Sequence, residues 1–215
     1  MEQKRWQWLG VDHTTYAVRD IELWRGVYVD LWGFREIHYT ADANPDGSSS
    51  MRLYGLECGN ERIALVSPIN RSSISHVHHF LERHGDHSVQ HVAIAVSNLE
   101  AFVEDMKCKQ FKFLGNIKVR TDLFGPIKQI FAKRFDAHLT PAEGPFYEFV
   151  ERPKDMESGL AEFFSSTVAG ELYEDVENDI AHDNGEPFID FMTSGLKIVR
   201  MYAVPVDPSN IKESI

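Results

Sequence analysis

The chain has 215 residues, 43% of them hydrophobic, and a formal net charge of −11 at pH 7. This length and composition allow one substantial core, or two small modules that share one. The negative charge and the lack of any run rich in lysine or arginine argue against nucleic acid or an anionic membrane surface as partner, because both would repel the chain.

The N-terminal residues lack the apolar stretch of a secretory signal, and no apolar run in the sequence is long enough to span a bilayer. We therefore expect a cytoplasmic protein without a membrane partner. Cys58 and Cys108 are the only cysteines and have no CxxC spacing. We expect two free thiols rather than a disulfide framework or a cysteine metal site.

The first predicted module covers residues 1–68 and has the order βαβββ. Alternating polarity over 8–18 predicts a half-buried strand, and Asp20 can cap a helix that reaches about Trp32 and stops at Gly33. Turn-rich residues then separate three predicted strands, at 34–40, 51–57 and 62–67.

Residues 69–87 are predicted to form a connector with a short helix around His76–Arg83, which Gly85 terminates. The connector is rich in histidine, at His76, His78, His79, His84 and His87. We interpret this cluster as the solvated side of the connector near a pocket mouth. Contact between one member and a substrate is the alternative.

The second predicted module, residues 88–152, repeats the order of the first. Its expected elements are a strand at 88–96, a helix from Asn98 to about Lys107, and strands near 111–119, 126–133 and 145–151. In the remainder, 153–215, the apolar pattern from Ser158 predicts a helix that continues to about Val176. The residues after it could form a lid, an arm or a packing strand.

The two modules carry a histidine at the same place. His13 and His91 are 78 residues apart, and the same offset relates Val18 to Val96 and Asp20 to Asn98. Two copies of one unit, each with a histidine on a strand, suggest a metal held between pseudo-symmetric halves.

Glu148 is the candidate for a third ligand. It lies in the last predicted strand between aromatic and aliphatic residues, where an unpaired carboxylate is costly to bury and a metal would remove that cost. Two histidines and one carboxylate form the facial triad of non-haem Fe(II), although they suit several divalent metals. Aligning the modules places Ala64 opposite Glu148, and a register error would give the role to Glu151 instead.

Three segments are similar, in order and spacing, to the catalytic C-terminal half of the 4-hydroxyphenylpyruvate dioxygenase family, within the vicinal oxygen chelate superfamily. They are Val89–Ala93, Gln129–Lys133 and Phe146–Arg152, and Pro68–Asn70 matches a further segment. The resemblance covers roughly residues 8–180. It implies an α+β fold in which two βαβββ modules form a half-barrel around a metal site, followed by a C-terminal helix.

The resemblance also implies roles for individual residues. In that family Fe(II) is chelated by a 2-oxo acid, which dioxygen then decarboxylates and hydroxylates; the iron ligands correspond here to His13, His91 and Glu148. The other implied residues are polar catalytic groups at Asn70, Gln90 and Gln129, and aromatic substrate contacts at Phe131 and Phe164. Gln90 has an alternative as an exposed or sheet-capping amide, because on an ideal strand it points away from His91.

This chain also departs from the family pattern. It lacks the noncatalytic N-terminal half, Leu53 stands at a position that is serine in the family, and residues 75–79 replace a connector that contains glutamine. These changes predict an altered pocket polarity, so the resemblance implies the reaction but not the side chain of the substrate. We expect an aryl or branched 2-oxo acid.

The sequence thus predicts an Fe(II)-dependent dioxygenase whose partners are a small-molecule substrate and dioxygen, with homo-oligomer formation left open. Rival enzymes in the superfamily are extradiol ring-cleavage dioxygenases and Mn(II)-dependent transferases or glyoxalases. A metal-free small-molecule binding module is a rival of another class. Retention of all three polar positions argues against that module.

Overall fold

The computed structural model describes residues 5–43, 50–69, 75–122, 125–133 and 145–153. Within these residues the strands form one eight-stranded mixed sheet, in the order β2-β3-β4-β1-β5-β8-β7-β6. The elements are β1 (Trp8–Ala17), α1 (Ile21–Gly26), η1 (Val27–Leu31), β2 (Arg35–Ala43), β3 (Ser50–Cys58), β4 (Glu61–Pro68), α2 (His76–His84), β5 (Ser88–Val96), α3 (Leu99–Cys108), β6 (Phe113–Asp122), β7 (Gly125–Ala132) and β8 (Phe146–Glu151).

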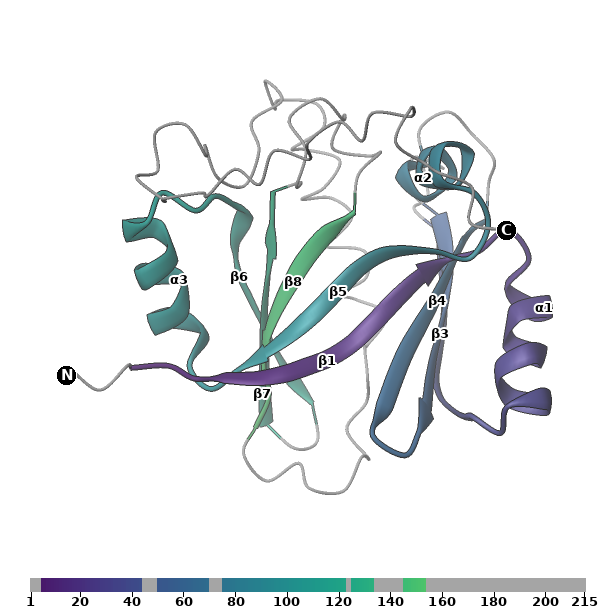
Figure 1. Cartoon of the computed structure of the whole chain (residues 1–215), viewed down its shortest axis with the longest axis horizontal. Coiled ribbons are helices and arrows are strands. Elements are labelled where there is room, and N and C mark those ends of the chain that lie inside the picture. Colours follow the sequence, from purple (N-terminus) through teal and green to yellow (C-terminus); the bar gives the residue numbers. More distant parts are fainter. Residues whose placement is uncertain (1–4, 44–49, 70–74, 123–124, 134–144, 154–215) are drawn as a thin grey trace, which may run out of the picture.

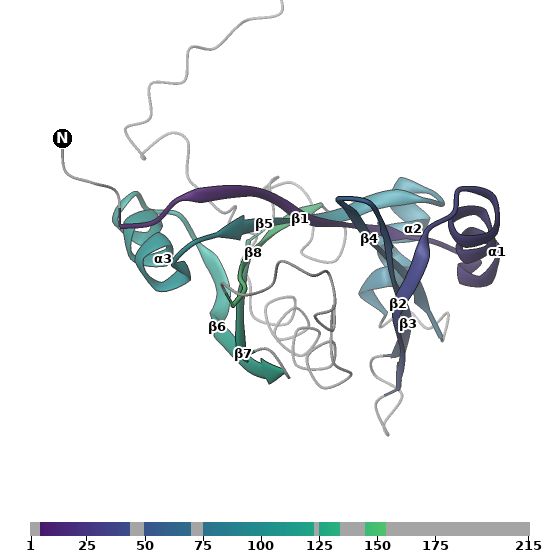
Figure 2. The same ribbon diagram turned by 90° about the horizontal axis from the view of Figure 1, so that it is seen from below.

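The predicted βαβββ repeat is confirmed. The central strands β1 and β5 are antiparallel, β1 is parallel to β4, and β5 is parallel to β8 (Figure 1). Each module therefore arranges its four strands in the same way about the β1–β5 pair. Figure 2 shows the sheet bent into an arch, with β6 and β7 descending on one side, β2 and β3 on the other, and α1 and α3 at the outer ends.

Equivalent caps begin the two outer helices. The side chain of Asp20 accepts a hydrogen bond from the Leu23 backbone N at 3.0 Å, and Asn98 accepts one from the Ala101 N at 3.0 Å. Such caps satisfy amide groups that the first turn of a helix leaves unbonded. The first helix differs from its prediction, because α1 passes after Gly26 into the π-helical turn η1.

A β-bulge interrupts β1 immediately before His13. Val11 pairs with Ile94 and His13 pairs with Ala93, so two steps along β1 correspond to one step along β5. Asp12 is the additional residue. A bulge redirects side chains away from the strict alternation of a strand, and Asp12 is accordingly buried, with 8% of its surface exposed.

A second bulge lies at the equivalent place in β5. Thr15 pairs with His91 and Tyr16 pairs with Val89, which leaves Gln90 as the additional residue of β5. Gln90 is 1% exposed. Its alternative as an exposed amide is therefore wrong, because the alternation of an ideal strand does not hold across the bulge.

One apolar cluster joins the two modules and α2. Its buried members are Ala17, Met51, Leu53, Ala64, Val66, Val77, Phe80, Leu81, Leu114 and Phe131, and Ile37 and Phe146 pack against it. Because the members come from strands of both modules and from the connector helix, burial of this cluster stabilises the arched arrangement of the two modules.

Three other expectations concern the rest of the chain. Cys58 and Cys108 are exposed free thiols, as predicted. No helix in the described part of the chain is long and apolar enough to cross a membrane. The predicted C-terminal helix, together with Asn70 and Phe164, lies outside the described residues.

Candidate metal centre

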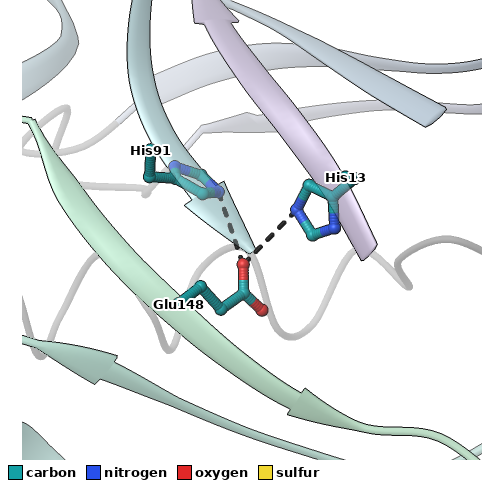
Figure 3. A group of neighbouring side chains, drawn as sticks. All are labelled: His13, His91 and Glu148. Atoms are coloured by element: carbon teal, nitrogen blue, oxygen red, sulfur yellow. Dashed lines mark ion pairs between the residues drawn. The ribbon is translucent and has the colours of Figure 1, made fainter. Parts of the chain in front are cut away.

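Three predicted ligands meet near the middle of the sheet. Figure 3 shows His13 on β1, His91 on β5 and Glu148 on β8 pointing toward one another. The Nε2 atom of each histidine lies 3.4 Å from Oε2 of Glu148. One potential ligand atom from each residue lies within 4.8 Å of the others, and all three residues are buried. The structure thus brings together the predicted triad.

Strand register explains this convergence. His13 pairs with Ala93 across β1 and β5, and Ala93 pairs with Glu148 across β5 and β8. Directly opposed residues project from the same face of a sheet, so His13 and Glu148 share a face. In the other module Thr15 pairs with Ala64, and this pair is equivalent to the pair of Ala93 and Glu148. Ala64 therefore occupies the position symmetric to Glu148, as the aligned repeats predict.

Glu151, the alternative third ligand, makes other contacts. Its Oε2 accepts a hydrogen bond from the Leu99 N at 2.6 Å, at the start of α3, and its Oε1 lies 3.3 Å from the Lys128 ammonium. These contacts tie β8 to α3 and β7. These contacts, together with the register that pairs Glu148 with Ala93, favour Glu148 over Glu151 as the third ligand.

His13 is held from behind by a buried ion pair. Its Nδ1 lies 2.8 Å from Oδ1 of Asp12, and the Arg152 guanidinium reaches both Asp12 oxygens, at 2.6 and 2.7 Å. Burial would raise the pKa of Asp12, but Arg152 and His13 together hold it well below its usual range. Asp12 is therefore ionised and accepts a hydrogen bond from the His13 imidazole.

His91 is held by neutral groups. Its Nδ1 lies 3.2 Å from Oε1 of Gln90, and its Nε2 lies 2.9 Å from the Thr15 hydroxyl. The ring stacks on Phe146 with centroids 4.9 Å apart. If Nδ1–H donates to Gln90, the Nε2 lone pair faces Thr15 and Glu148, which is the orientation that ligation requires.

The charges in the centre are strongly coupled. Burial would raise the pKa of Glu148, but the two imidazoles lower it to about 2. Burial lowers the pKa of His91, whereas for His13 the Asp12 and Glu148 carboxylates outweigh burial and raise the pKa. At neutral pH Glu148 is thus ionised while almost wholly buried.

This donor set fits a divalent metal ion. Neither carboxylate oxygen of Glu148 makes a regular hydrogen bond within the described residues, although a buried carboxylate normally needs such partners. Two imidazole nitrogens and one carboxylate oxygen are a common set for divalent iron and related metals. A bound cation at this place would compensate the buried negative charge.

Two further predicted residues lie close by. Phe131 pairs in register with Glu148, and its ring centroid is 6.3 Å from that of His91. Gln129 precedes Phe131 by two residues and so shares its face of β7. Gln129 is buried, and its Nε2 has no hydrogen-bond partner among the described residues.

His76 corrects the interpretation of the histidine-rich connector. It is 5% exposed, so it does not belong to a solvated surface, whereas His84 on the same helix is exposed. Burial, with smaller contributions from the charges of His79 and His91, lowers the pKa of His76 to about 3. The connector therefore places one neutral imidazole within electrostatic reach of His91.

Sequence reasoning missed Asp12, Arg152 and Thr15. For Asp12 the signal was available, because the 78-residue offset places it opposite Gln90. Arg152 follows the Glu148 strand within a motif that resembles the dioxygenases, but the sequence does not indicate that it reaches across β5 to Asp12.

A family model described as the glyoxalase/bleomycin resistance protein/dioxygenase superfamily matches residues 12–124, more than half of the chain. The chain belongs to this superfamily. Its expected vicinal oxygen chelate fold is thereby confirmed, since the site and the sheet described above lie on that architecture.

Individual relatives agree with this assignment. The chain is 25% identical over 195 residues to 4-hydroxyphenylpyruvate dioxygenase of Pseudomonas aeruginosa, an alignment that covers 79% of the chain and 52% of the relative. It is 27% identical over 108 residues to hemolysin VllY of Vibrio vulnificus, covering 48% of the chain and 29% of the relative. The chain thus spans about half the length of the first curated relative and less than a third of the second.

Solved structures show the same fold. A mutant 4-hydroxymandelate synthase from Streptomyces coelicolor superposes with a TM-score of 0.65 at 19% identity, covering 79% of this chain and 54% of that one. A hypothetical protein from Bacillus halodurans superposes with a TM-score of 0.50 at 21% identity, covering 72% of this chain and 100% of that one. The likeness at these identities is one of fold.

Proposed function

We propose that this chain is a non-haem Fe(II)-dependent dioxygenase of the 4-hydroxyphenylpyruvate dioxygenase type, acting on an aryl or branched 2-oxo acid. The observation that carries the proposal is the buried convergence of His13, His91 and Glu148. Homology to a dioxygenase with that activity, over 79% of the chain, supports the choice of reaction.

The reaction has a defined balance. The substrate loses its carboxyl carbon as carbon dioxide, one oxygen atom of dioxygen enters the new carboxylate, and the other forms a hydroxyl group on the same molecule. The metal, when bound, supplies Lewis-acid and redox chemistry for these steps. The protein residues contribute ligation, orientation and exclusion of water.

The three candidate ligands are already oriented for metal binding in the structure. The contacts of Asp12 and Gln90 with the two Nδ1 atoms direct both Nε2 atoms toward Glu148. Glu148 is ionised, because its pKa is lowered to about 2. Its negative charge would partly neutralise a divalent cation in a buried place where water cannot do so.

Apolar residues surround the centre and favour an apolar substrate side chain. Phe146 stacks on His91 and Phe131 lies edge-on to it. Phe131 belongs to the buried cluster that includes Leu53, and Phe146 packs against that cluster. An aryl or branched group packed here would exclude water from the reacting atoms. The buried Gln129 amide offers a hydrogen-bond donor for a substrate oxygen.

The test is oxygen consumption by protein loaded anaerobically with Fe(II), with carbon dioxide measured in parallel. The panel comprises 4-hydroxyphenylpyruvate, phenylpyruvate and 2-oxoisocaproate. Coupled oxygen uptake and carbon dioxide release with at least one acid, lost in His91→Ala, is the expected result. Turnover of a catechol without consumption of a 2-oxo acid would replace the proposal with extradiol cleavage.

A further inference from the structure

We infer that Asp12 and Arg152 are positioning residues that orient His13 and strengthen its metal-binding nitrogen, an inference that rests on the proposed metal centre. The two residues come from different modules. Asp12 lies in β1 and Arg152 follows β8, and β5 separates these strands in the sheet. The ion pair therefore crosses the central strand directly behind the candidate ligand.

The contacts fix the Asp12 carboxylate in one orientation. Arg152 Nε donates to Oδ2 at 2.6 Å and Nη2 donates to Oδ1 at 2.7 Å, while the side chains of Arg152 and Asp12 are only 12% and 3% exposed. A two-pronged guanidinium–carboxylate pair holds both partners in a plane. The guanidinium also compensates a buried negative charge that would otherwise be costly.

The oriented carboxylate in turn fixes the tautomer of His13. An ionised carboxylate can only accept a hydrogen bond, so the Nδ1 atom, 2.8 Å from Asp12 Oδ1, must carry the proton. Neutral imidazole then leaves its lone pair on Nε2, the atom that lies 3.4 Å from Glu148. A carboxylate behind a metal-binding histidine also makes the imidazole a stronger ligand.

The two histidines consequently differ as ligands. His91 is backed by the neutral Gln90 amide at 3.2 Å, and His13 by an anion at 2.8 Å. The pseudo-symmetric repeat thus supplies two imidazoles of unequal donor strength. Removing the charge of Asp12, or replacing Arg152, is expected to make the two imidazoles more nearly equal as donors and to lower the metal affinity of the site.

The experiment is an anaerobic Co(II) titration with chelator competition, in which the cobalt absorption spectrum is recorded for the wild-type chain, Asp12→Asn, Arg152→Gln and Arg152→Lys. Asp12→Asn and Arg152→Gln are expected to bind about 10- to 100-fold more weakly, the range found for outer partners of metal ligands. Their visible bands are expected to shift, since His13 can rotate. Arg152→Lys keeps the charge but not the fork, so an intermediate affinity is expected.

Matched controls remove an ion pair elsewhere. Arg25 and Glu36 also lie 2.6 Å apart, in the first module and away from the centre. Arg25→Gln and Glu36→Gln are expected to bind Co(II) with wild-type affinity and an unchanged spectrum. Circular dichroism and thermal unfolding show which variants are folded, and if Asp12→Asn and Arg152→Gln are not, Arg152→Lys decides by the same criteria.

Two outcomes would overturn the inference, and they differ. If the wild-type chain binds Co(II) and the folded Asp12 and Arg152 variants match its affinity and spectrum, the positioning role is wrong while the metal centre stands. If the wild-type chain binds neither Co(II) nor Fe(II), the proposed metal centre itself is wrong, and the positioning role falls with it.

Discussion

Asp12 and Gln90 are structural equivalents, each the additional residue of a β-bulge and each in contact with Nδ1 of the histidine that follows it, at 2.8 and 3.2 Å. In an unbulged strand neighbouring side chains point to opposite faces. The bulge lets two consecutive residues of each strand act together, one facing the centre and the other behind it.

Gln90→Leu tests the contact behind His91. The leucine removes the acceptor of a buried Nδ1–H, which we predict lowers the free energy of unfolding by about 1–3 kcal/mol. Metal affinity is predicted to fall about 10-fold, because the imidazole loses its orientation. Urea unfolding and metal titration measure the two effects. Gln7→Leu, at an exposed position, serves as the control, and equal behaviour of the two variants would contradict the prediction.

Glu148→Gln tests the carboxylate ligand. The amide keeps the shape of the side chain but removes the charge, so we predict a loss of metal affinity of more than about 100-fold, greater than for an outer partner. Glu151→Gln is the matched control in the same strand, since Glu151 contacts Leu99 and Lys128 instead. The metal content of each variant is measured after gel filtration. Metal retained by Glu148→Gln and lost by Glu151→Gln would reverse the assignment.

Thr15→Val tests a competition at His91. The Thr15 hydroxyl lies 2.9 Å from Nε2, the atom proposed to bind the metal. We predict that valine destabilises the metal-free protein by about 1 kcal/mol and raises metal affinity roughly 5-fold, since the metal no longer displaces a hydrogen bond. Calorimetric titration and unfolding of the metal-free form measure these changes. Thr14→Val, on the opposite face of β1, is the control and should leave the metal affinity unchanged.

His76 predicts a pH dependence of stability in the metal-free protein. Burial lowers its folded-state pKa to about 3 from an ordinary value of 6.5, so the unfolded chain takes up the proton first as the pH falls. The stability is therefore complete above pH 6.5 and decreases as the pH falls toward 3.

His76→Gln should reduce the slope of unfolding free energy against pH between about 6.5 and 5. Val77→Ala, at a buried position of the same helix, is the control that lowers stability without removing a titratable group. Urea unfolding at several pH values gives both slopes. An unchanged slope in His76→Gln together with wild-type folding would show that His76 is not the residue responsible.

Much of this fold could be predicted from the sequence because the chain contains two copies of the same βαβββ pattern. The 78-residue offset located both central strands and both helix caps, and the expected strand at 88–96 matches β5. The triad of His13, His91 and Glu148 was predicted from the same offset, from the apolar neighbours of Glu148 and from the resemblance to the dioxygenase family. These features are local or periodic, so the amino-acid pattern carries them.

The rest depends on pairing between strands. The bulges at Asp12 and Gln90 are two of the places where the register between β1 and β5 shifts by one residue, and neither strand encodes such a shift alone. Likewise the Arg152–Asp12 contact joins residues 140 positions apart. The burial of His76 reflects how α2 packs over the sheet, which the polarity of its neighbours does not reveal.

Labelled dioxygen tests directly whether this chain is a dioxygenase that acts on a 2-oxo acid. Fe(II)-loaded protein is incubated with ¹⁸O₂ and the most active 2-oxo acid of the panel, and the product is analysed by mass spectrometry. We expect one labelled oxygen in the new carboxylate and one in the hydroxyl group of the same molecule, with one carbon dioxide released. A metal-loaded chain that incorporates no label with any of the acids would contradict it.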